Sequence, residues 1–413
     1  MRLLFVHQNF PGQYLHLVRH LVATGRHEIV FITEPNDNEI PGARKVPYIP
    51  PRPARLDAVH QAARDFDLAM RRAEAVAVTA RKLRQLGFTP DLILGHHGWG
   101  ELLNLPDVWP DAPMLGYLEF FYRLHGADVN FDPEFPMHPE EFARVRAKNA
   151  VNLLALELEK HGQSPTAWQL STYPGWSRAG ITLLPEGANL DLCRPDPAVR
   201  RSALEVGGMR IAPADKLVTY VSRDLEPYRG FHIVMRALPP ILAARRDVKI
   251  VLIGGDRVSY GLPPPRGSWR QQMLAELGDA IDLSRVALPG RVDYELYRRL
   301  LQRSDAHVYL TYPFVASWSL REALAMGCTV IGSDTQPVRE FVVANETGLL
   351  TPFHDPAALA DTVLRLLEDG ALSRRLHEGA RRFATERLDM RDTLAGYVKL
   401  IAHLAGTTIA DVA

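Results

Sequence analysis

Two arginines at a fixed spacing offer the first chemistry that the sequence suggests. Arg223 and Arg229 lie in the segment 222–230, which follows an apolar run at 216–221 and precedes a helical pattern starting near Gly230. Loops after the carboxyl ends of parallel strands are where ligands bind in open α/β sheets. Planar guanidinium groups and the N–H groups of a helix start both suit a diphosphate. Two solvated loop arginines are an equally good interpretation of this pair alone.

Two further segments place small or polar residues after apolar runs. Gly254 would let a ligand approach the backbone closely, although a tight turn without a ligand fits equally well. Farther along, Ser319 is expected to cap a helix that carries Glu322 in its first turn, as in a capping box. The alternative role of Glu322 is to accept hydrogen bonds from a ribose diol. The exposed N–H groups of Trp318, Ser319 and Leu320 would face a phosphate.

The first half of the chain carries polar loops of a similar kind. One loop, at residues 9–13, follows the first apolar run, and the other, at residues 95–100, holds His96 and His97 between glycines. Both loops should lie at the same edge of a sheet. A histidine there could hydrogen-bond a sugar or stabilise charge. A lone histidine is more often structural, and the pair favours a functional role only modestly.

Several other chemistries find no support. The sequence has no His-Glu-x-x-His or paired-cysteine metal motif, no Gly-x-Ser-x-Gly nucleophile elbow and no P-loop. The first strand is not followed by Gly-x-Gly-x-x-Gly, which argues against a nicotinamide dehydrogenase. Two cysteines, Cys193 and Cys328, are too few for a disulfide framework, and we expect both to pack as small hydrophobic residues.

The bulk composition limits the partners. Lysines plus arginines number 48, as do aspartates plus glutamates, so the net charge gives no reason to expect nucleic acid binding. No apolar run is long enough for a membrane-spanning helix, and the opening one is too short for a signal peptide. We therefore expect a cytoplasmic protein. Arg64, Arg71 and Lys82 form a basic stripe on a helix predicted at 62–86; a solvated face is the preferred interpretation, and weak peripheral contact with the inner membrane face stays open.

The elements that must position these residues alternate in type. Short, continuously apolar runs separated by amphipathic stretches predict parallel sheets with crossover helices, an α/β fold. The predicted strands lie at 3–6, 28–32, 91–94, 113–118, 181–184, 216–221, 248–253, 286–288, 307–310 and 329–331. Prolines and a glycine between Pro185 and Pro197 interrupt this periodicity and suggest a domain boundary. The segment from about 388 onward is helical in pattern, and its packing partner cannot be deduced.

Taken together, these motifs resemble family 4 of the retaining glycosyltransferases. The similarity covers nearly the whole chain. The matching segments are Pro11-Gly12, Pro90 to His96, Leu184 to Leu190, Arg223 with Arg229, Pro289 to Val292, and Glu322 to Gly327. Two positions depart from the family pattern. Arg229 stands where the lysine of the diphosphate pair is expected, and Phe314 stands where the first of two paired glutamates is expected, eight residues before Glu322. The chain therefore resembles a variant subgroup of the family that lacks the first glutamate.

The resemblance implies a GT-B fold, with two Rossmann-like doubly wound domains facing across a cleft that holds the active site. The domains would be residues 1–184 on the acceptor side and 185–390 for the nucleotide sugar, with a last helix at 391–413 crossing back. Transfer would proceed with retention and without a metal or other cofactor. Catalysis would rest on Arg223, Arg229 and His96, with His97 as second choice. The expected donor-binding residues are Gly12, Gly254, Arg291, Val292, Ser317, Trp318, Ser319, Leu320 and Glu322.

The expected substrates are a nucleotide-sugar donor and a saccharide, lipid-linked or small-molecule acceptor. Three alternatives remain open. A nucleotide-sugar epimerase on a similar fold would interconvert donors without an acceptor. A relative of the sugar-phosphate phosphorylases would carry pyridoxal phosphate on a lysine. A non-catalytic binder, which Phe314 suggests, would hold the donor without releasing nucleotide.

Overall fold

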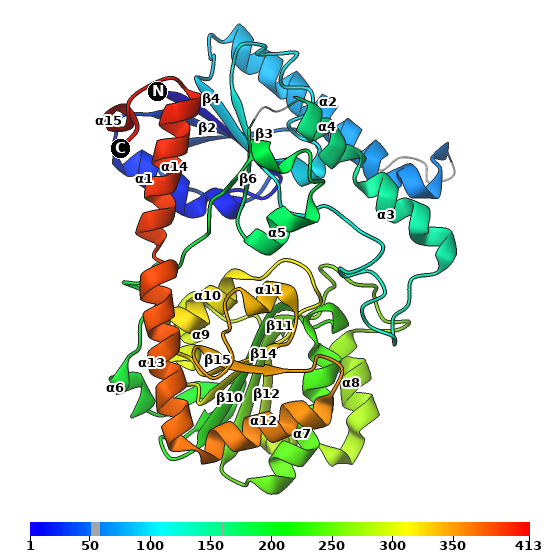
Figure 1. The fold of residues 1–413 in the computed structure, drawn as a ribbon, viewed down its shortest axis with the longest axis vertical. Coiled ribbons are helices and arrows are strands. Elements are labelled where there is room, and N and C mark those ends of the chain that lie inside the picture. The colour runs from blue at the N-terminus through cyan, green and yellow to red at the C-terminus, as the bar shows by residue number, and fades with distance from the viewer. Residues whose placement is uncertain (51–57, 159–160) are drawn as a thin grey trace. The chain divides into compact units, whose positions relative to one another are not determined.

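The computed structural model describes residues 1–50, 58–158 and 161–413 (Figure 1). The chain divides into two units. Unit 1 comprises Met1–Glu186 and Arg391–Ala413, and unit 2 comprises Gly187–Met390. The change from unit 1 to unit 2 falls two residues after the boundary expected at 184/185.

Unit 1 is built on a parallel seven-stranded sheet in the order β3-β2-β1-β4-β5-β6-β7. Its strands are β1 (Arg2–Val6), β2 (Glu28–Thr33), β3 (Ala43–Pro47), β4 (Leu92–His96), β5 (Met114–Tyr117), β6 (Gly162–Ser164) and β7 (Ile181–Leu183). The strand order reverses between β1 and β4. Loops leaving these two neighbours therefore diverge, and they open a crevice at the carboxyl edge of the sheet.

Helices cover both faces of this sheet. They are α1 (Leu15–Ala23), α2 (Arg64–Gln85), α3 (Phe142–Lys148), α4 (Ala150–Leu158), α5 (Ala167–Thr172), α14 (Met390–Leu404) and α15 (Ile409–Val412). Alternate residues of β1 point to opposite faces: Leu3 packs with α1 and α14, whereas Leu4 packs with α2. The C-terminal α14 is tied to this core by Ile401 and by Tyr397, whose hydroxyl donates to Gln163 Oε1 at 2.9 Å.

Unit 2 holds a parallel six-stranded sheet in the order β12-β11-β10-β13-β14-β15. Its strands are β10 (Lys216–Asp224), β11 (Val248–Gly255), β12 (Val286–Gly290), β13 (Ala306–Tyr309), β14 (Val330–Ser333) and β15 (Gly348–Thr351), with a separate hairpin of β8 (Leu204–Val206) and β9 (Met209–Ile211). The order reverses between β10 and β13, so unit 2 has its own crevice there.

The helices of unit 2 also lie on both faces of its sheet. They are α6 (Pro197–Arg200), α7 (Phe231–Ala244), α8 (Trp269–Leu277), α9 (Tyr294–Arg303), α10 (Trp318–Ala325), α11 (Gln336–Arg339), α12 (Pro356–Glu368) and α13 (Gly370–Arg387). Helices α7 and α12 pack side by side (Figure 1), and α10 packs against α13. The two ends of unit 2 meet, because Ala188 N–H donates to Leu388 O at 2.7 Å and Met390 N–H donates to Ala188 O at 3.0 Å.

The ten strands predicted from apolar runs are confirmed, as is the long helix α2. Both cysteines are buried, as predicted, and burial raises the pKa of the Cys193 thiol to about 11 and that of Cys328 to about 12. Among the described residues, no helix is long and apolar enough to cross a membrane.

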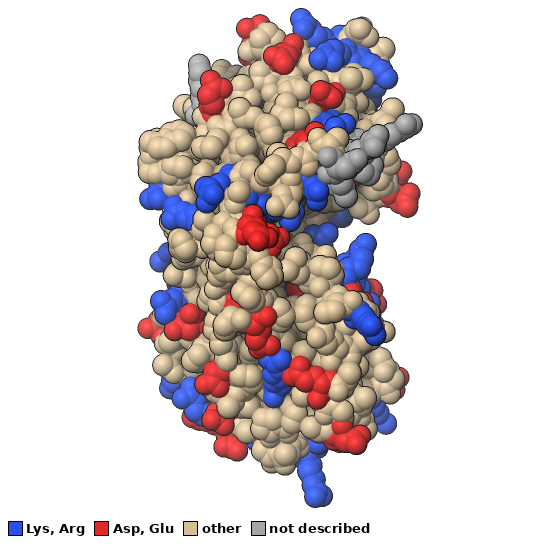
Figure 2. Space-filling view, turned by 90° about the vertical axis from the view of Figure 1, so that its right-hand side faces the viewer, with Lys and Arg blue, Asp and Glu red and all other residues tan. Residues whose placement is uncertain are grey.

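The surface charges bear on the basic stripe predicted for α2. Arg71 pairs with Asp67 one turn earlier, at 2.7 Å, so part of the stripe is neutralised. Lys82 is exposed near the end of α2. Basic side chains gather at the upper end of the face shown in Figure 2, whereas acidic and basic side chains are interspersed over its lower half.

Candidate functional site

The switch point of unit 2 lies between β10 and β13, and the loops that follow these two strands carry candidate site residues. Gly230 ends the first loop with a left-handed φ of 71° and precedes α7. A Cβ atom at this position would lie 2.5 Å from Leu310 Cβ in the second loop, so only glycine allows the two loops to approach this closely. The sequence thus brings two loops with polar side chains together at the switch point of the sheet.

Arg229 joins these two loops. It is 6 % exposed, and its Nη1 donates to Thr311 Oγ1 at 2.7 Å and to Val315 O at 2.8 Å, both in the loop after β13. Its guanidinium carbon lies 4.9 Å from the centre of the Tyr260 ring. The arginine is thereby held rigidly at the crevice, with a positive charge close to the start of α10.

Arg223 is placed differently from Arg229. It lies near the end of β10 and is exposed to solvent. The six-residue spacing puts both arginines at the carboxyl edge of the sheet. Arg229 is a buried anchor, and Arg223 is a surface group that can move to meet a ligand.

Two buried carboxylates next to the arginines were not predicted. Glu226 is fully buried, and its carboxylate accepts the N–H groups of Ser259, Tyr260 and Gly261 at 2.9–3.3 Å. Burial raises the pKa of Glu226, and these hydrogen bonds oppose the shift. Glu226 therefore fixes the loop after β11, which carries the Tyr260 ring over Arg229. The sequence offered one sign that Glu226 belongs to the site, namely its position three residues after Arg223.

Asp224, the other carboxylate, connects three strand ends. Its Oδ2 accepts the Ser259 hydroxyl at 2.5 Å, and its Oδ1 lies 3.0 Å from Arg291 Nη2. A Cβ atom on Gly255 would lie 2.3 Å from Asp224 Oδ1, and one on Gly254 would lie 2.8 Å from Leu225 Cδ2. The glycine pair therefore serves close packing of β10 against β11. That packing accounts for Gly254 without a ligand and leaves the question of a ligand contact open.

Arg291 and Val292 follow β12 at the same edge of the sheet. The Arg291 side chain is 52 % exposed even though it pairs with Asp224, so it remains reachable. Val292 is partly buried and packs against the hydrophobic core. A nucleotide base beside this short loop would meet one cation, Arg291, and one apolar side chain, Val292.

The capping box expected at the start of helix α10 is absent. The N-cap of this helix is Ser317, not Ser319, and no side chain caps it. Glu322 thus lies beyond the first turn, and its two carboxylate oxygens accept the hydroxyls of Tyr294 at 2.7 Å and Tyr297 at 2.6 Å, both on α9. Burial raises the pKa of Glu322, and the tyrosine hydrogen bonds oppose the shift. The carboxylate is held in place by a neighbouring helix and keeps lone pairs for a further donor.

The start of α10 differs from prediction in one respect. Leu320 is buried and its N–H donates to Ser317 O at 3.2 Å, so it is not an exposed donor. Ser317, Trp318 and Ser319 are partly exposed, and the hydroxyls of the two serines lie 2.6 Å apart. A phosphate at this helix start would therefore meet the first N–H groups and the serine hydroxyls, without Leu320.

Phe314 is buried among aromatic side chains. Its ring centre lies 5.4 Å from that of Tyr228 and 5.3 Å from that of Tyr260. The Tyr228 ring in turn lies tilted against the Tyr312 ring, with centres 4.6 Å apart. Phe314 thus packs against the same tyrosine that covers Arg229. The position is filled by a structural aromatic residue that shapes the wall of the crevice and offers no charge.

The crevice of unit 1 brings His96 together with a histidine that was not predicted. The rings of His7, directly after β1, and His96, at the end of β4, have centres 5.5 Å apart and meet edge to face. Burial lowers the pKa of His7 to about 3, and His96 contributes to the shift. Gly12 has a φ of 55°, and a Cβ there would lie 2.8 Å from the His7 ring. Gly12 therefore packs its backbone on the His7 ring. His97 is buried.

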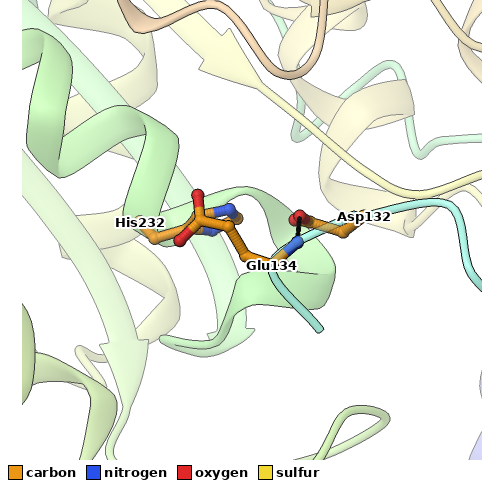
Figure 3. A group of neighbouring side chains, drawn as sticks. All are labelled: Asp132, Glu134 and His232. Atoms are coloured by element: carbon orange, nitrogen blue, oxygen red, sulfur yellow. Dashed lines mark hydrogen bonds between the residues drawn. The ribbon is translucent and has the colours of Figure 1, made fainter. Parts of the chain in front are cut away.

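Acidic side chains also occur farther along unit 1, in the loop between β5 and α3. Asp132 is buried, and its Oδ1 accepts the N–H of Glu134 at 3.0 Å, which forms a tight turn (Figure 3). His232, drawn in the same figure, lies on α7 of unit 2.

Comparison with protein families gives two adjoining matches. Residues 25–193 match the model described as glycosyl transferase family 4 group, and residues 209–383 match the model described as glycosyl transferases group 1. Together the two matches span most of both units. The chain belongs to the family 4 glycosyltransferases. The resemblance deduced from the sequence motifs is thereby confirmed.

Curated relatives match over part of the length of this chain. A phosphatidyl-myo-inositol mannosyltransferase of Mycobacterium leprae is 29% identical over 196 residues, which cover 46% of this chain and 46% of the relative. A D-inositol 3-phosphate glycosyltransferase of Corynebacterium efficiens is 28% identical over 204 residues, covering 48% and 46% respectively. The chain therefore spans about half the length of the curated relatives it matches.

Solved structures share the fold over nearly the whole chain. Sucrose-phosphate synthase from Thermosynechococcus elongatus gives a TM-score of 0.73 at 20% identity, with 98% of this chain and 99% of that one covered. The Anabaena protein HepE in complex with UDP-glucose gives 0.69 at 16% identity, with coverage of 98% and 100%. The two doubly wound sheets of this chain are thus those of the GT-B fold, as predicted.

Proposed function

We propose that the chain transfers a sugar from a nucleotide-sugar donor to a hydroxyl of a saccharide, lipid-linked or small-molecule acceptor, with retention at the anomeric carbon. The observation that carries this proposal is the anchoring of Arg229 at the β10–β13 switch point. Its Nη1 donates to Val315 O, two residues before Ser317, the N-cap of α10. A buried cation beside a helix start is an arrangement suited to a diphosphate leaving group.

The chemistry would rest on stabilisation of the departing nucleoside diphosphate. Arg229 supplies a fixed positive charge, and the exposed Arg223 can close onto the phosphates from the surface. Charge that develops on the leaving oxygen is then met by groups already in position, which lowers the barrier without reorganisation. We expect arginines and helix N–H groups to do this without a divalent metal or another cofactor. His96 would position the transferred sugar.

Glu322 is the proposed contact to the ribose. Its carboxylate is oriented by Tyr294 and Tyr297, and the partly exposed α10 start lies one turn before it. A base would then lie near Arg291 and Val292, after β12. The relatives named for phosphatidyl-myo-inositol and D-inositol 3-phosphate make an inositol-containing acceptor one candidate for this chain. Peripheral contact with a membrane, through exposed basic residues such as Lys82, would suit a lipid-linked acceptor.

A donor screen tests the proposal. The protein is incubated with UDP-glucose, UDP-galactose, GDP-mannose and UDP-N-acetylglucosamine, each with and without myo-inositol or a monosaccharide acceptor. Release of nucleoside diphosphate that depends on an acceptor, with an anomeric proton of unchanged configuration in the product, is the expected result. Interconversion of donors without acceptor would indicate an epimerase. Tight donor binding without any release would indicate a non-catalytic binder.

A further inference from the structure

Two carboxyl groups of unit 1 meet at one tyrosine hydroxyl. Glu34 directly follows β2, Tyr48 directly follows β3, and Glu101 lies in the loop after β4, so all three belong to the carboxyl edge of the sheet. The Tyr48 hydroxyl oxygen is 3.1 Å from Glu34 Oε1 and 3.2 Å from Glu101 Oε1. Tyr48 and Glu101 are each 1 % exposed, so water has little access to the contact between them.

These two contacts need two hydrogens, and a pair of ionised carboxylates leaves only one. An ionised carboxylate only accepts, and a phenol has a single O–H. Tyr48 can then donate to one carboxylate, while the other faces the phenol oxygen with its lone pairs. A second hydrogen on one of the carboxyl groups would be donated to the phenol oxygen and would make both contacts hydrogen bonds. The geometry therefore calls for one proton, on Glu34 or on Glu101.

The surroundings assign this proton to Glu101. Glu34 has a cation beside it, because Arg72 Nε on α2 lies 3.4 Å from Glu34 Oε1, and the Glu34 side chain is 30 % exposed. The Oε2 atom of Glu101, in contrast, is buried and has no hydrogen-bond partner among the described residues. Burying an ionised carboxylate without partners costs far more than burying the neutral acid. Glu34 is therefore the ionised group and Glu101 the neutral one.

The charged and titratable groups that face Glu101 come from four elements. They are Glu34 after β2, Tyr48 after β3, His96 at the end of β4 and Arg72 on α2. Burial raises the pKa of the Glu101 carboxyl, and its own backbone N–H, Arg72 and His96 offset only part of that rise. Burial and the two carboxyl groups also raise the pKa of Tyr48, so the phenol keeps its hydrogen.

We propose that Glu101 keeps its proton at neutral pH and donates it in a hydrogen bond to Tyr48, that Tyr48 donates to Glu34, and that loss of the Glu101 proton to solvent at alkaline pH breaks this Tyr48 bridge. This property goes beyond sugar transfer and does not depend on it. β3 lies at the edge of the sheet, and β2 and β1 separate it from β4. The Tyr48 bridge therefore ties the end of the edge strand to the loop after β4, and Arg72 ties it to α2.

The direction of the pH effect follows from the raised pKa. A glutamate of the unfolded chain has the ordinary pKa of 4.5, so between that value and the higher folded pKa the folded state binds the extra proton. Stability that depends on this proton is complete below the unfolded pKa and is lost as pH rises through the folded pKa. Above the folded pKa, two carboxylates compete for one phenol hydrogen, and the carboxyl edge of unit 1 should loosen.

A first measurement locates the proton. Infrared difference spectra between wild type and Glu101→Gln in D2O at neutral pH show whether the replaced carboxyl group absorbed as a protonated acid or as a carboxylate. We expect a protonated-acid band for Glu101→Gln and a carboxylate band for the matched variant Glu34→Gln. A carboxylate band for Glu101→Gln, or a protonated-acid band for Glu34→Gln, overturns the proposal.

A second measurement keeps the proposal testable if a variant does not fold. Wild-type protein labelled with carbon-13 at the glutamate side-chain carboxyls should show one carboxyl resonance at the shift of a protonated acid at neutral pH, and this resonance should move to the carboxylate shift as pH is raised. If every labelled resonance already has the carboxylate shift at neutral pH, no glutamate holds the proton and the Tyr48 bridge is refuted.

A third measurement follows Tm from neutral to alkaline pH. The amide of Glu101→Gln can donate to Tyr48 at every pH, so its Tm should fall less steeply than that of wild type, by up to about 3–6 °C per pH unit above the folded pKa. Glu74→Gln, an exposed carboxylate on α2, is the matched control and should follow wild type. If the Tm values of Glu101→Gln and wild type fall in parallel, the pH dependence assigned to Glu101 is wrong.

Discussion

Replacing Glu322 by glutamine tests whether its carboxylate binds the ribose or only supports the fold. The native side chain accepts hydroxyls from Tyr294 and Tyr297 at 2.7 and 2.6 Å. An amide keeps one acceptor oxygen and loses the charge. A hydrogen bond to a charged group contributes about 1.5–3 kcal/mol and a neutral one about 0.5–1.5 kcal/mol, so each tyrosine bond should weaken by about 1 kcal/mol.

The net loss of stability should be smaller than that sum. Tyr294 is 48% exposed, so water replaces much of its lost bond. Burial raises the pKa of Glu322, which shows that the charged form is disfavoured in the fold, and the neutral amide removes that cost. We therefore expect Glu322→Gln to destabilise unit 2 by about 1 kcal/mol, which lowers Tm by about 2–4 °C for a domain of this size.

In the same Glu322→Gln variant, the affinity for the nucleotide should fall by more than the loss of stability accounts for. A ribose diol that loses a charged acceptor forfeits about 1.5–3 kcal/mol, or roughly 10- to 150-fold in Kd. Tyr297→Phe is the matched control, because it removes one hydroxyl from the carboxylate yet leaves the charge for the ribose. Phe314→Leu is the second control, since a buried aromatic residue should affect sugar positioning and not the nucleotide.

Calorimetric titration of the nucleoside diphosphate into the three variants decides. If Tyr297→Phe weakens binding as much as Glu322→Gln, Glu322 acts only by fixing α9 against α10. If Glu322→Gln binds like wild type while Phe314→Leu loses the nucleotide, the assignment of this motif is wrong.

Three further predictions follow from other sites. Arg223→Ala and Arg229→Ala should each lower kcat/KM at least tenfold, because each removes a charge-assisted hydrogen bond worth about 1.5–3 kcal/mol. Only Arg229→Ala should also lower Tm, because Arg229 is buried and hydrogen-bonded whereas Arg223 is exposed. Wild-type kinetics in both folded variants would contradict the assigned roles. A chelator should leave activity intact, and activity lost in chelator and restored by Mg²⁺ or Mn²⁺ would refute metal independence. The His7 pKa of about 3 lies below the unfolded value of 6.5, so the unfolded chain binds the proton first and stability falls as pH drops below about 6.5. His7→Asn should reduce this slope by up to about 1.4 kcal/mol per pH unit in urea titrations, and an unchanged slope would show that His7 is not held neutral.

The strands that the sequence revealed are those whose burial on both faces demands continuous apolar runs. In the two parallel sheets, as far as the structure describes them, three other strands were missed for physical reasons. β3 (Ala43–Pro47) lies at the sheet edge and is largely polar, β6 (Gly162–Ser164) has three residues and no large apolar side chain, and β15 (Gly348–Thr351) is a short edge strand. Short strands at or near an edge need little apolar surface, so hydrophobic patterning gives no signal for them.

The candidate site was predictable where a residue follows a strand, and less so where its partner is distant in sequence. Arg229 was found from its loop, whereas its contact with Thr311 spans 82 residues. Glu226 and Asp224 carry no motif that single-sequence reasoning can recognise, and only the folded structure shows which residues each one contacts. The capping box for Glu322 failed because α10 is capped at Ser317, two residues earlier than predicted, which moves Glu322 beyond the first turn. Its carboxylate instead accepts two tyrosine hydroxyls from α9, 25 and 28 residues away in sequence.

The adjoining ends of unit 2 have a consequence for how this chain can be divided. Ala188 pairs with Leu388 and Met390 through backbone hydrogen bonds, so the segment 187–390 begins and ends at one place. In topological terms unit 2 is an insertion into unit 1, whose own sequence resumes at Arg391 and completes its core with α14. A segment with neighbouring termini can be exchanged, excised or circularly permuted with little disturbance. Unit 2, which carries the proposed nucleotide-binding residues, could therefore be transplanted between relatives as one piece, leaving unit 1, the proposed acceptor side, unchanged.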